Sequence, residues 1–146
     1  MALTGTYERN LDDKLRLALP KRLRDDFGDS ELTSFFIAPG IGKSLDLYSP
    51  AGFERLARKF EKQPTNQAMV LSYMRLFYAQ SERVDIDGQG RIRIPERLAT
   101  LAGLKRDVVL LGVHDHVELW DSVTWRQFLD THSPDFDQIA LQAFQS

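Results

Sequence analysis

The chain of 146 residues contains no cysteine. It can therefore form neither a disulfide framework nor a thiolate site for metal binding or redox chemistry. No apolar run approaches the roughly 18 residues that a membrane-spanning helix needs. The N-terminal stretch MALTGTYERN has no apolar segment of the length found in signal peptides. These absences predict a cytoplasmic protein with no membrane partner.

A strong charge of one sign is also missing. The net charge is only −2, which argues against a protein that binds any polyanion over its whole surface. The charges are unevenly distributed, because cations gather between Tyr7 and Arg24 and acids dominate from Asp107 onwards. With a hydrophobic content of 42%, the chain can build the core of one compact domain or of two small interlocked halves.

The sequence also lacks the motifs of most enzymes. The segment from Ile41 to Ser44 resembles the end of a phosphate-binding loop, but that motif requires a glycine where this chain has Ile37. No Ser-His-Asp or paired-carboxylate arrangement has a partner pattern. We therefore expect no enzymatic activity, no small-molecule substrate and no cofactor.

Two short segments contain the residue types of metal ligands. The segment from His114 to His116 carries two histidines that could share a strand face, but zinc needs about four ligands, and His132 lies in an unpatterned tail. The segment from Asp85 to Gly88 resembles a fragment of a calcium loop, but a strand pattern follows it and no helices flank it. We expect a polar turn at the histidines and no metal site in either segment.

What the sequence does contain is one motif in two copies. The first copy, DDKLRLALP, spans Asp12 to Pro20, and the second, DGQGRIRIP, spans Asp87 to Pro95. Further along, LDLYSPAGF in the first half matches VELWDSVTW in the second. A duplication followed by a short insertion or deletion explains both pairs of segments.

Each copy of the motif predicts a loop, a strand and a short helix. In the second copy, Asp87 and Gly88 are a tight-turn signal, and Gly90 adds a position that accepts a positive φ angle. The strict alternation of RIRI over residues 91–94 then predicts a strand that buries its isoleucines and displays its guanidinium groups.

Hydrophobic periodicity and turn signals predict the remaining elements. We expect strands over 5–11, 15–19, 35–37, 45–48, 81–86, 91–94, 108–111 and 117–120, and helices over 21–27, 53–61, 66–79, 96–101 and 122–129. The helix over 66–79 is expected to join the two copies. The segment after His132 is expected to be a loop with a weak final helix.

The cationic strand face is the strongest functional signal. A single Arg-x-Arg strand is usually a solvated edge, but here the pattern occurs twice, each time after an Asp-containing loop and before a short helix. Guanidinium groups contact phosphates and pair with guanine O6 and N7, and a β-ribbon can enter the major groove of DNA. The candidate DNA contacts are Lys14, Arg16, Arg91 and Arg93, with Lys21 and Arg22 as additional phosphate contacts.

The two motif copies and the segments that follow them resemble the MraZ family of bacterial transcriptional regulators. The resemblance extends from Gly5 to about Phe128. It implies an α+β fold of two tandem AbrB-like swapped-hairpin β-barrel halves with flanking helices and a pseudo-twofold axis within one chain. The implied division is a first half over 5–63, a linking helix over 64–80, a second half over 81–132 and an acidic polar tail over 133–146.

The resemblance also implies a function and partners. Members of the family form homo-oligomeric rings and bind short G-rich direct repeats of double-stranded DNA upstream of the division and cell-wall gene cluster that they regulate. The chain is thus expected to be a cytoplasmic, nucleoid-associated regulator of transcription.

Two departures from the family pattern leave an alternative open. Leu15 stands where the family usually has glycine, and Gln89 stands where lysine is frequent. A left-handed backbone at Leu15 would cost roughly 1–2 kcal/mol, so we expect the first loop to have a different shape from the second. The alternative function is an oligomeric scaffold or binding module whose DNA binding is weakened or lost.

Overall fold

A six-stranded antiparallel sheet forms the centre of the computed structural model, which describes residues 2–29 and 31–145. Its strand order is β1-β7-β8-β4-β3-β5. The strands are β1 (Thr6–Asn10), β7 (Asp107–Val113), β8 (His116–Asp121), β4 (Ser44–Tyr48), β3 (Ser34–Pro39) and β5 (Glu82–Asp85). Two short strands, β2 (Arg16–Ala18) and β6 (Arg91–Arg93), pair separately as a small ribbon.

The two copies of the duplicated sequence interlock through this sheet. Strand β1 of the first copy pairs with β7 of the second, and β5 of the second copy pairs with β3 of the first. The central pair, β4 and β8, contains the equivalent strands of the two copies, and Asp46 faces its equivalent Glu118 across it. Neither copy therefore has a complete sheet of its own.

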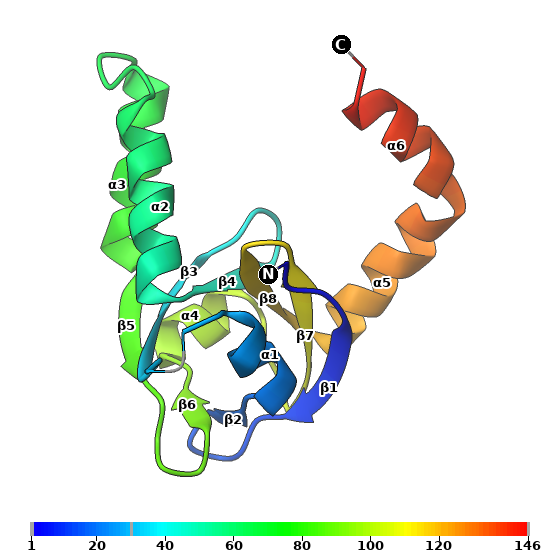
Figure 1. Ribbon diagram of the computed structural model, residues 1–146. Coiled ribbons are helices and arrows are strands. Elements are labelled where there is room, and N and C mark those ends of the chain that lie inside the picture. The colour runs from blue at the N-terminus through cyan, green and yellow to red at the C-terminus, as the bar shows by residue number, and fades with distance from the viewer. Residues whose placement is uncertain (1, 30, 146) are drawn as a thin grey trace.

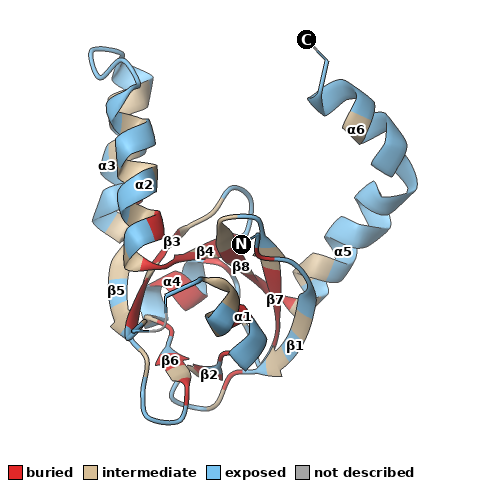
Figure 2. Ribbon diagram, in the orientation of Figure 1, coloured by how far each residue is buried: buried red, intermediate tan, exposed pale blue. Residues whose placement is uncertain are grey.

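One face of the sheet covers the hydrophobic core. Alternate residues of the strands point inward, as in the burial of Leu45 and Leu47 on β4, and of Val117 and Leu119 on β8. They pack against the β2–β6 ribbon and the short helices α1 (Lys21–Asp26) and α4 (Glu96–Leu101), which together close the core. Figure 2 shows these buried segments in the middle of the molecule.

Two helical arms extend from the other side of the sheet (Figure 1). The first is the hairpin of α2 (Pro50–Glu61) and α3 (Ala68–Gln80), and the second is α5 (Ser122–His132) followed by α6 (Phe136–Ala143). Phe53 of the first arm stacks on Phe36 of β3 at 4.3 Å between ring centroids. In the second arm, Trp125 packs against Trp120 of β8 at 5.3 Å.

The elements expected from periodicity are confirmed, with one exception at the C-terminus. The segment after His132 was expected to be a loop with a weak final helix; the final helix is present as α6, but a 3-10 turn (Ser133–Asp135) replaces the loop and continues the arm. Pro134 does not interrupt the arm, because it stands in the first turn of the 3-10 helix, where a missing N–H is tolerated. Phe136, Ile139 and Ala143 have the spacing of one helical face. Among the described residues, no helix combines the length and apolar character required to cross a membrane.

Candidate nucleic-acid interface

The predicted arginines meet on the β2–β6 ribbon, at the end of the molecule opposite the helical arms (Figure 1). The two strands are antiparallel, and Arg16 lies directly opposite Arg93. Arg91 lies opposite Ala18, on the same side of the ribbon as the other two guanidinium groups. On the other side, Leu17 faces Ile92, and both are fully buried in the core. Each strand thus has one buried side and one cationic side, as the alternation in the sequence predicts.

The loops that precede the two strands have the same hydrogen-bond pattern. In the first loop, Asp12 Oδ1 accepts from the backbone N–H groups of Lys14 at 2.9 Å and of Arg16 at 2.8 Å. In the second, Asp87 Oδ1 accepts from the N–H groups of Gln89 and Arg91, both at 2.9 Å. The backbone hydrogen bond from the arginine is the largest cause of a lowered pKa at each aspartate, and the guanidinium group lowers it further.

Each aspartate also fixes the side chain of its arginine. Arg16 Nε donates to Asp12 Oδ2 at 2.7 Å, and Arg91 Nε donates to Asp87 Oδ2 at 2.9 Å. In the described part of the chain, both side chains make their hydrogen bonds through Nε alone. The terminal guanidinium nitrogens, which form the fork that recognises phosphate or guanine, are left available.

The expectation of a different shape for the first loop is wrong. Leu15 has a φ angle of 59°, and its equivalent Gly90 has a φ angle of 76°, so both loops use a left-handed residue at the same place. The Asp12 hydrogen bonds impose this shape. Leu15 compensates for the strain because its side chain packs against the core cluster, whereas the space above Gly90 is taken by the guanidinium group of Arg24.

Replacing Gly90 by alanine is expected to destabilise the fold by about 1–2 kcal/mol, because a β-carbon is disfavoured at this φ angle. The added atom would also lie 3.1 Å from Arg24 Nη2. Urea unfolding at a fixed protein concentration measures the change. Gly88 is the control in the same loop, since nothing lies within 4 Å of a β-carbon there. Equal effects of Gly88→Ala and Gly90→Ala would contradict the assignment of the strain to position 90.

The other predicted contacts border the ribbon. Lys14 is exposed in the turn before β2, and Lys21 and Arg22 are exposed in the first turn of α1, which follows β2 directly. Lys21 makes an exposed ion pair with Asp25 at 2.9 Å. In residues 2–29 and 31–145, no ion pair involves Lys14, Arg22 or Arg93. All six predicted contact residues therefore have side chains that reach solvent.

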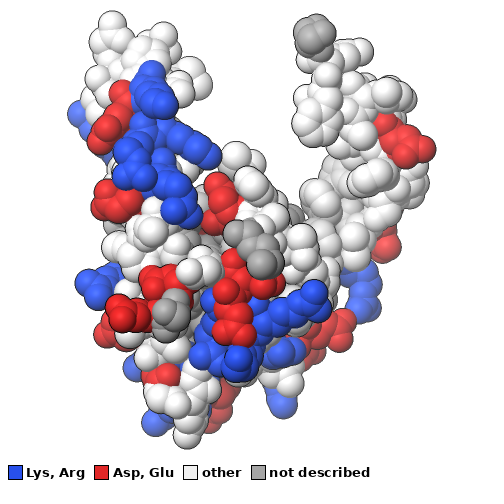
Figure 3. Space-filling view, viewed as in Figure 1, with Lys and Arg blue, Asp and Glu red and all other residues white. Residues whose placement is uncertain are grey.

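A second group of cations was not predicted. Helix α2 carries Arg55, Arg58 and Lys59, and Lys62 follows its last residue. Figure 3 shows basic side chains covering this side of the first arm. Lys59 reaches Asp115 at 3.7 Å, and the others are exposed. The helix over 53–61 was predicted from its apolar periodicity alone. The spacing of its basic residues would have indicated the polar face.

A cluster of one histidine and two carboxylates in the middle of the sheet was also not predicted. The expected polar turn comprises His114 and Asp115, but His116 is the first residue of β8 and approaches Asp46 and Glu118. Burial raises the pKa of Asp46 to about 6, although His116 attracts its charged form. Burial alone would lower the pKa of His116, but hydrogen bonds with Glu118 and Asp115 raise it to about 9.

Fold and interface together define a duplicated α+β protein in which the equivalent strands of the two copies build one cationic ribbon. Comparison with known families gives the particular family. The family model described as "MraZ protein, putative antitoxin-like" matches this chain twice, over residues 2–70 and 77–146. The chain belongs to the MraZ family.

Several curated relatives cover almost the whole chain. One from Mycoplasmoides gallisepticum is 37% identical over 136 residues, which are 93% of each chain. One from Salinispora arenicola is 36% identical and covers 92% of each chain. One from Alkaliphilus metalliredigens is 33% identical and covers 93% of this chain and 92% of its own. All three are named "Transcriptional regulator MraZ".

Proposed function

We propose that this protein is a regulator of transcription that binds double-stranded DNA through the β2–β6 ribbon and has no enzymatic activity. The observation that carries the proposal is the convergence of Arg16, Arg91 and Arg93 on one solvent-facing side of a ribbon whose other side is buried. The name shared by the relatives supports the same role.

The ribbon supplies both kinds of contact that sequence-specific binding needs. A two-stranded ribbon fits the major groove, and arginine pairs in bidentate fashion with guanine O6 and N7. The Nε hydrogen bonds of Arg16 and Arg91 to their aspartates pre-orient the forks, so less side-chain entropy is lost on binding. Lys14, Lys21 and Arg22 are placed beside the ribbon to contact phosphates, which fix the register on the duplex.

The interlocked strands support an AbrB-like swapped-hairpin arrangement with a pseudo-twofold axis. The equivalent residues Asp46 and Glu118 face each other across β4 and β8, as expected at such an axis. We retain the division into halves over 5–63 and 81–132, with a linking segment over 64–80 and a tail over 133–146.

The exposed apolar residues of the helical arms fit an assembly of several copies. In the described part of the chain they are Met69, Tyr73, Leu76 and Tyr78 on the first arm, and Val123, Phe128, Leu129, Phe136, Ile139, Leu141 and Phe144 on the second arm and its end. Large apolar side chains that remain exposed together often mark contact sites between proteins. In a homo-oligomeric ring, each ribbon would raise the effective concentration of the next one over a neighbouring DNA repeat.

The proposed targets are short G-rich direct repeats upstream of the division and cell-wall gene cluster. The protein would bind them in the cytoplasm, as part of the nucleoid.

The rival function is an oligomeric scaffold or binding module with weakened or lost DNA binding. The retained left-handed loop at Leu15 removes one argument for that rival, since the substitution does not change the shape of the motif. Gln89 in place of lysine still removes one cation beside the ribbon.

A gel-shift assay on the DNA upstream of the protein's own gene tests the proposal. Binding is expected at low salt and should weaken steeply as salt rises, because each neutralised phosphate releases counterions. A duplex with the same composition in shuffled order is the control for sequence preference. No shift of the native duplex at low salt, with a protein that is folded and oligomeric by light scattering, would favour the scaffold.

A further inference from the structure

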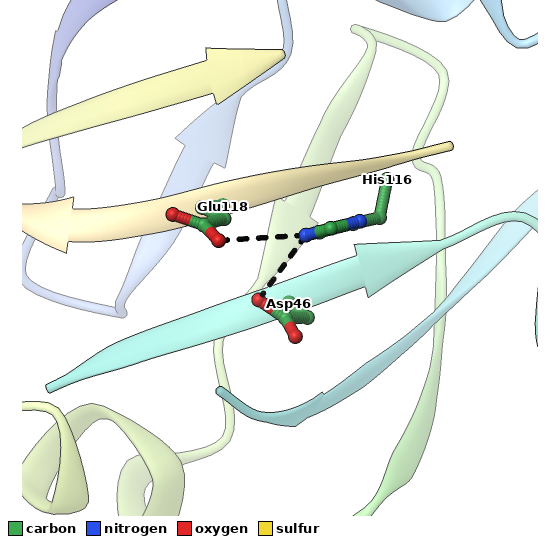
Figure 4. A group of neighbouring side chains, drawn as sticks. All are labelled: Asp46, His116 and Glu118. Atoms are coloured by element: carbon green, nitrogen blue, oxygen red, sulfur yellow. Dashed lines mark hydrogen bonds and ion pairs between the residues drawn. The ribbon is translucent and has the colours of Figure 1, made fainter. Parts of the chain in front are cut away.

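The middle of the six-stranded sheet holds three side chains with metal-ligating atoms. Asp46 of β4 and Glu118 of β8 are directly opposite in the strand register, and His116 precedes Glu118 by two residues on the same face. The ligating atoms of the three all lie within 4.8 Å of one another. Figure 4 shows His116 pointing between the two carboxylates.

The two carboxylates of the cluster need a cation between them, and either a protonated His116 or a metal ion bound to the neutral imidazole supplies it. Like charges directly opposite on neighbouring strands destabilise a sheet, and a buried charge needs a partner or a metal ion. The side chains of Asp46, His116 and Glu118 are only 14%, 15% and 23% exposed. Asp46 Oδ1 is buried and makes no hydrogen bond with the described residues.

The outer contacts orient the ligating atoms inward. His116 Nδ1 lies 2.8 Å from Asp115 Oδ1, and a proton on Nδ1 leaves the Nε2 lone pair free. This is the carboxylate–histidine arrangement that commonly supports a metal-bound imidazole. Trp120 Nε1 donates to Glu118 Oε1 at 2.9 Å, which leaves Oε2 as the oxygen that faces His116.

The spacing of these atoms fits a small divalent ion. His116 Nε2 lies 3.4 Å from Glu118 Oε2 and 3.8 Å from Asp46 Oδ1. Ligands of a tetrahedral zinc ion with bonds near 2.1 Å are separated by about 3.4 Å. The two distances from His116 are close to this value, and the ligating oxygens of Asp46 and Glu118 lie within 4.8 Å of each other.

A cavity of about 270 Å³ lies beside the cluster. It is lined by Asp46, His116 and Glu118 and by aromatic side chains that include Tyr48 and Tyr73. Tyr48 also stacks on the His116 ring at 5.3 Å between centroids. The backbone of Gly40 packs close to Asp46, since a β-carbon at position 40 would lie 2.9 Å from Oδ1. The cavity has room for a fourth ligand such as water.

We propose that Asp46, His116 and Glu118 form a binding site for one divalent transition-metal ion of the zinc class. One imidazole with two carboxylates suits zinc, cobalt or nickel, whereas calcium takes six to eight oxygen ligands and magnesium a nearly all-oxygen octahedron. Asp115 is a positioning residue, because it acts on the metal through the His116 ring. The site lies on the sheet face away from the ribbon, so its failure would leave the proposed DNA binding untouched.

Calorimetric titration of the untagged, chelator-treated full-length protein with zinc chloride tests the site, and cobalt absorption reports the ligand geometry. Wild type is expected to bind one equivalent per chain and to gain thermal stability with zinc. His116→Ala should lose this binding, and Asp115→Asn should weaken it about 10–100-fold. His114→Ala is the matched control from the adjacent turn and should bind as wild type.

Two results would overturn the proposal. The first is a folded wild type that shows no stoichiometric binding and no thermal shift with zinc or cobalt. The second is binding that His116→Ala and His114→Ala reduce equally, because the metal would then sit elsewhere. Asp46→Asn, which keeps the size of the side chain, replaces His116→Ala if that variant fails to fold by circular dichroism, and it should lose the site in the same way.

Discussion

Replacing Arg16, Arg91 and Arg93 together by alanine is expected to weaken binding to the native duplex at least 100-fold, since a good bidentate arginine–guanine pair contributes about 1–3 kcal/mol. Arg16→Ala alone should weaken binding about tenfold and relax the preference at one position. The loss of affinity should be larger for the assembly than for one isolated ribbon, because every ribbon of the assembly loses its contacts at once. Titration by fluorescence anisotropy at two salt concentrations measures it.

The control for this experiment removes the same number of cations elsewhere. Arg55 and Arg58 of α2 and Lys62 directly after it are exposed, in the basic group of the first arm. Their triple replacement by alanine should reduce affinity much less than the ribbon variant. A larger loss from the α2 variant would move the DNA-binding surface from the ribbon to the arm. Arg16→Lys separates charge from geometry, because it keeps the phosphate attraction and loses the bidentate fork.

Replacing Ile92 by alanine is expected to lower the free energy of unfolding by about 2–5 kcal/mol, as for other large-to-small changes in a packed core. Ile92 is 1% exposed and faces Leu17 across the ribbon, so the cavity would open where the two copies meet. A loss of that size is a large fraction of the stability of a small domain. Urea unfolding followed by circular dichroism measures it at a fixed protein concentration.

This experiment also tests the interlocking of the two copies. Since both contribute strands to one sheet, Ile92→Ala should shift a single cooperative transition rather than split it in two. Ile41→Ala is the control, because Ile41 is 92% exposed at a hairpin tip and should change stability by less than about 0.5 kcal/mol. Two separate transitions in the wild type would show that the copies unfold independently.

Local pattern was enough to predict the elements and the chemistry of the ribbon. The alternation around Arg91 predicted a strand with one buried and one cationic side, and the duplicated motif predicted a second strand of the same kind around Arg16. The same reasoning failed at Leu15, because the cost of a left-handed leucine was weighed without the compensation from its packing. It also predicted a loop directly after His132, because the polar, proline-containing composition was given more weight than the helical apolar spacing.

Pairing across the sheet could not be predicted in this way. The duplication aligned Asp46 with Glu118 as equivalent positions, but nothing in the sequence placed them opposite each other. His116 was weighed as a metal ligand only together with the other two histidines: His114, which lies in the turn before the strand, and His132 at the end of α5. Contacts between distant strands depend on register, and register is set by how all hydrophobic faces are buried together.

The sequence by itself determined that this protein has two related copies, which residues of the two motif strands face water, and that those residues include cations. These properties follow from the period of a strand and from local turn chemistry. Only the tertiary structure decided that Arg16 meets Arg93 on one ribbon and that Asp46, His116 and Glu118 share one cluster. The physical reason is that each copy lacks the strands to bury its own apolar face, so the pairing partners come from the other copy.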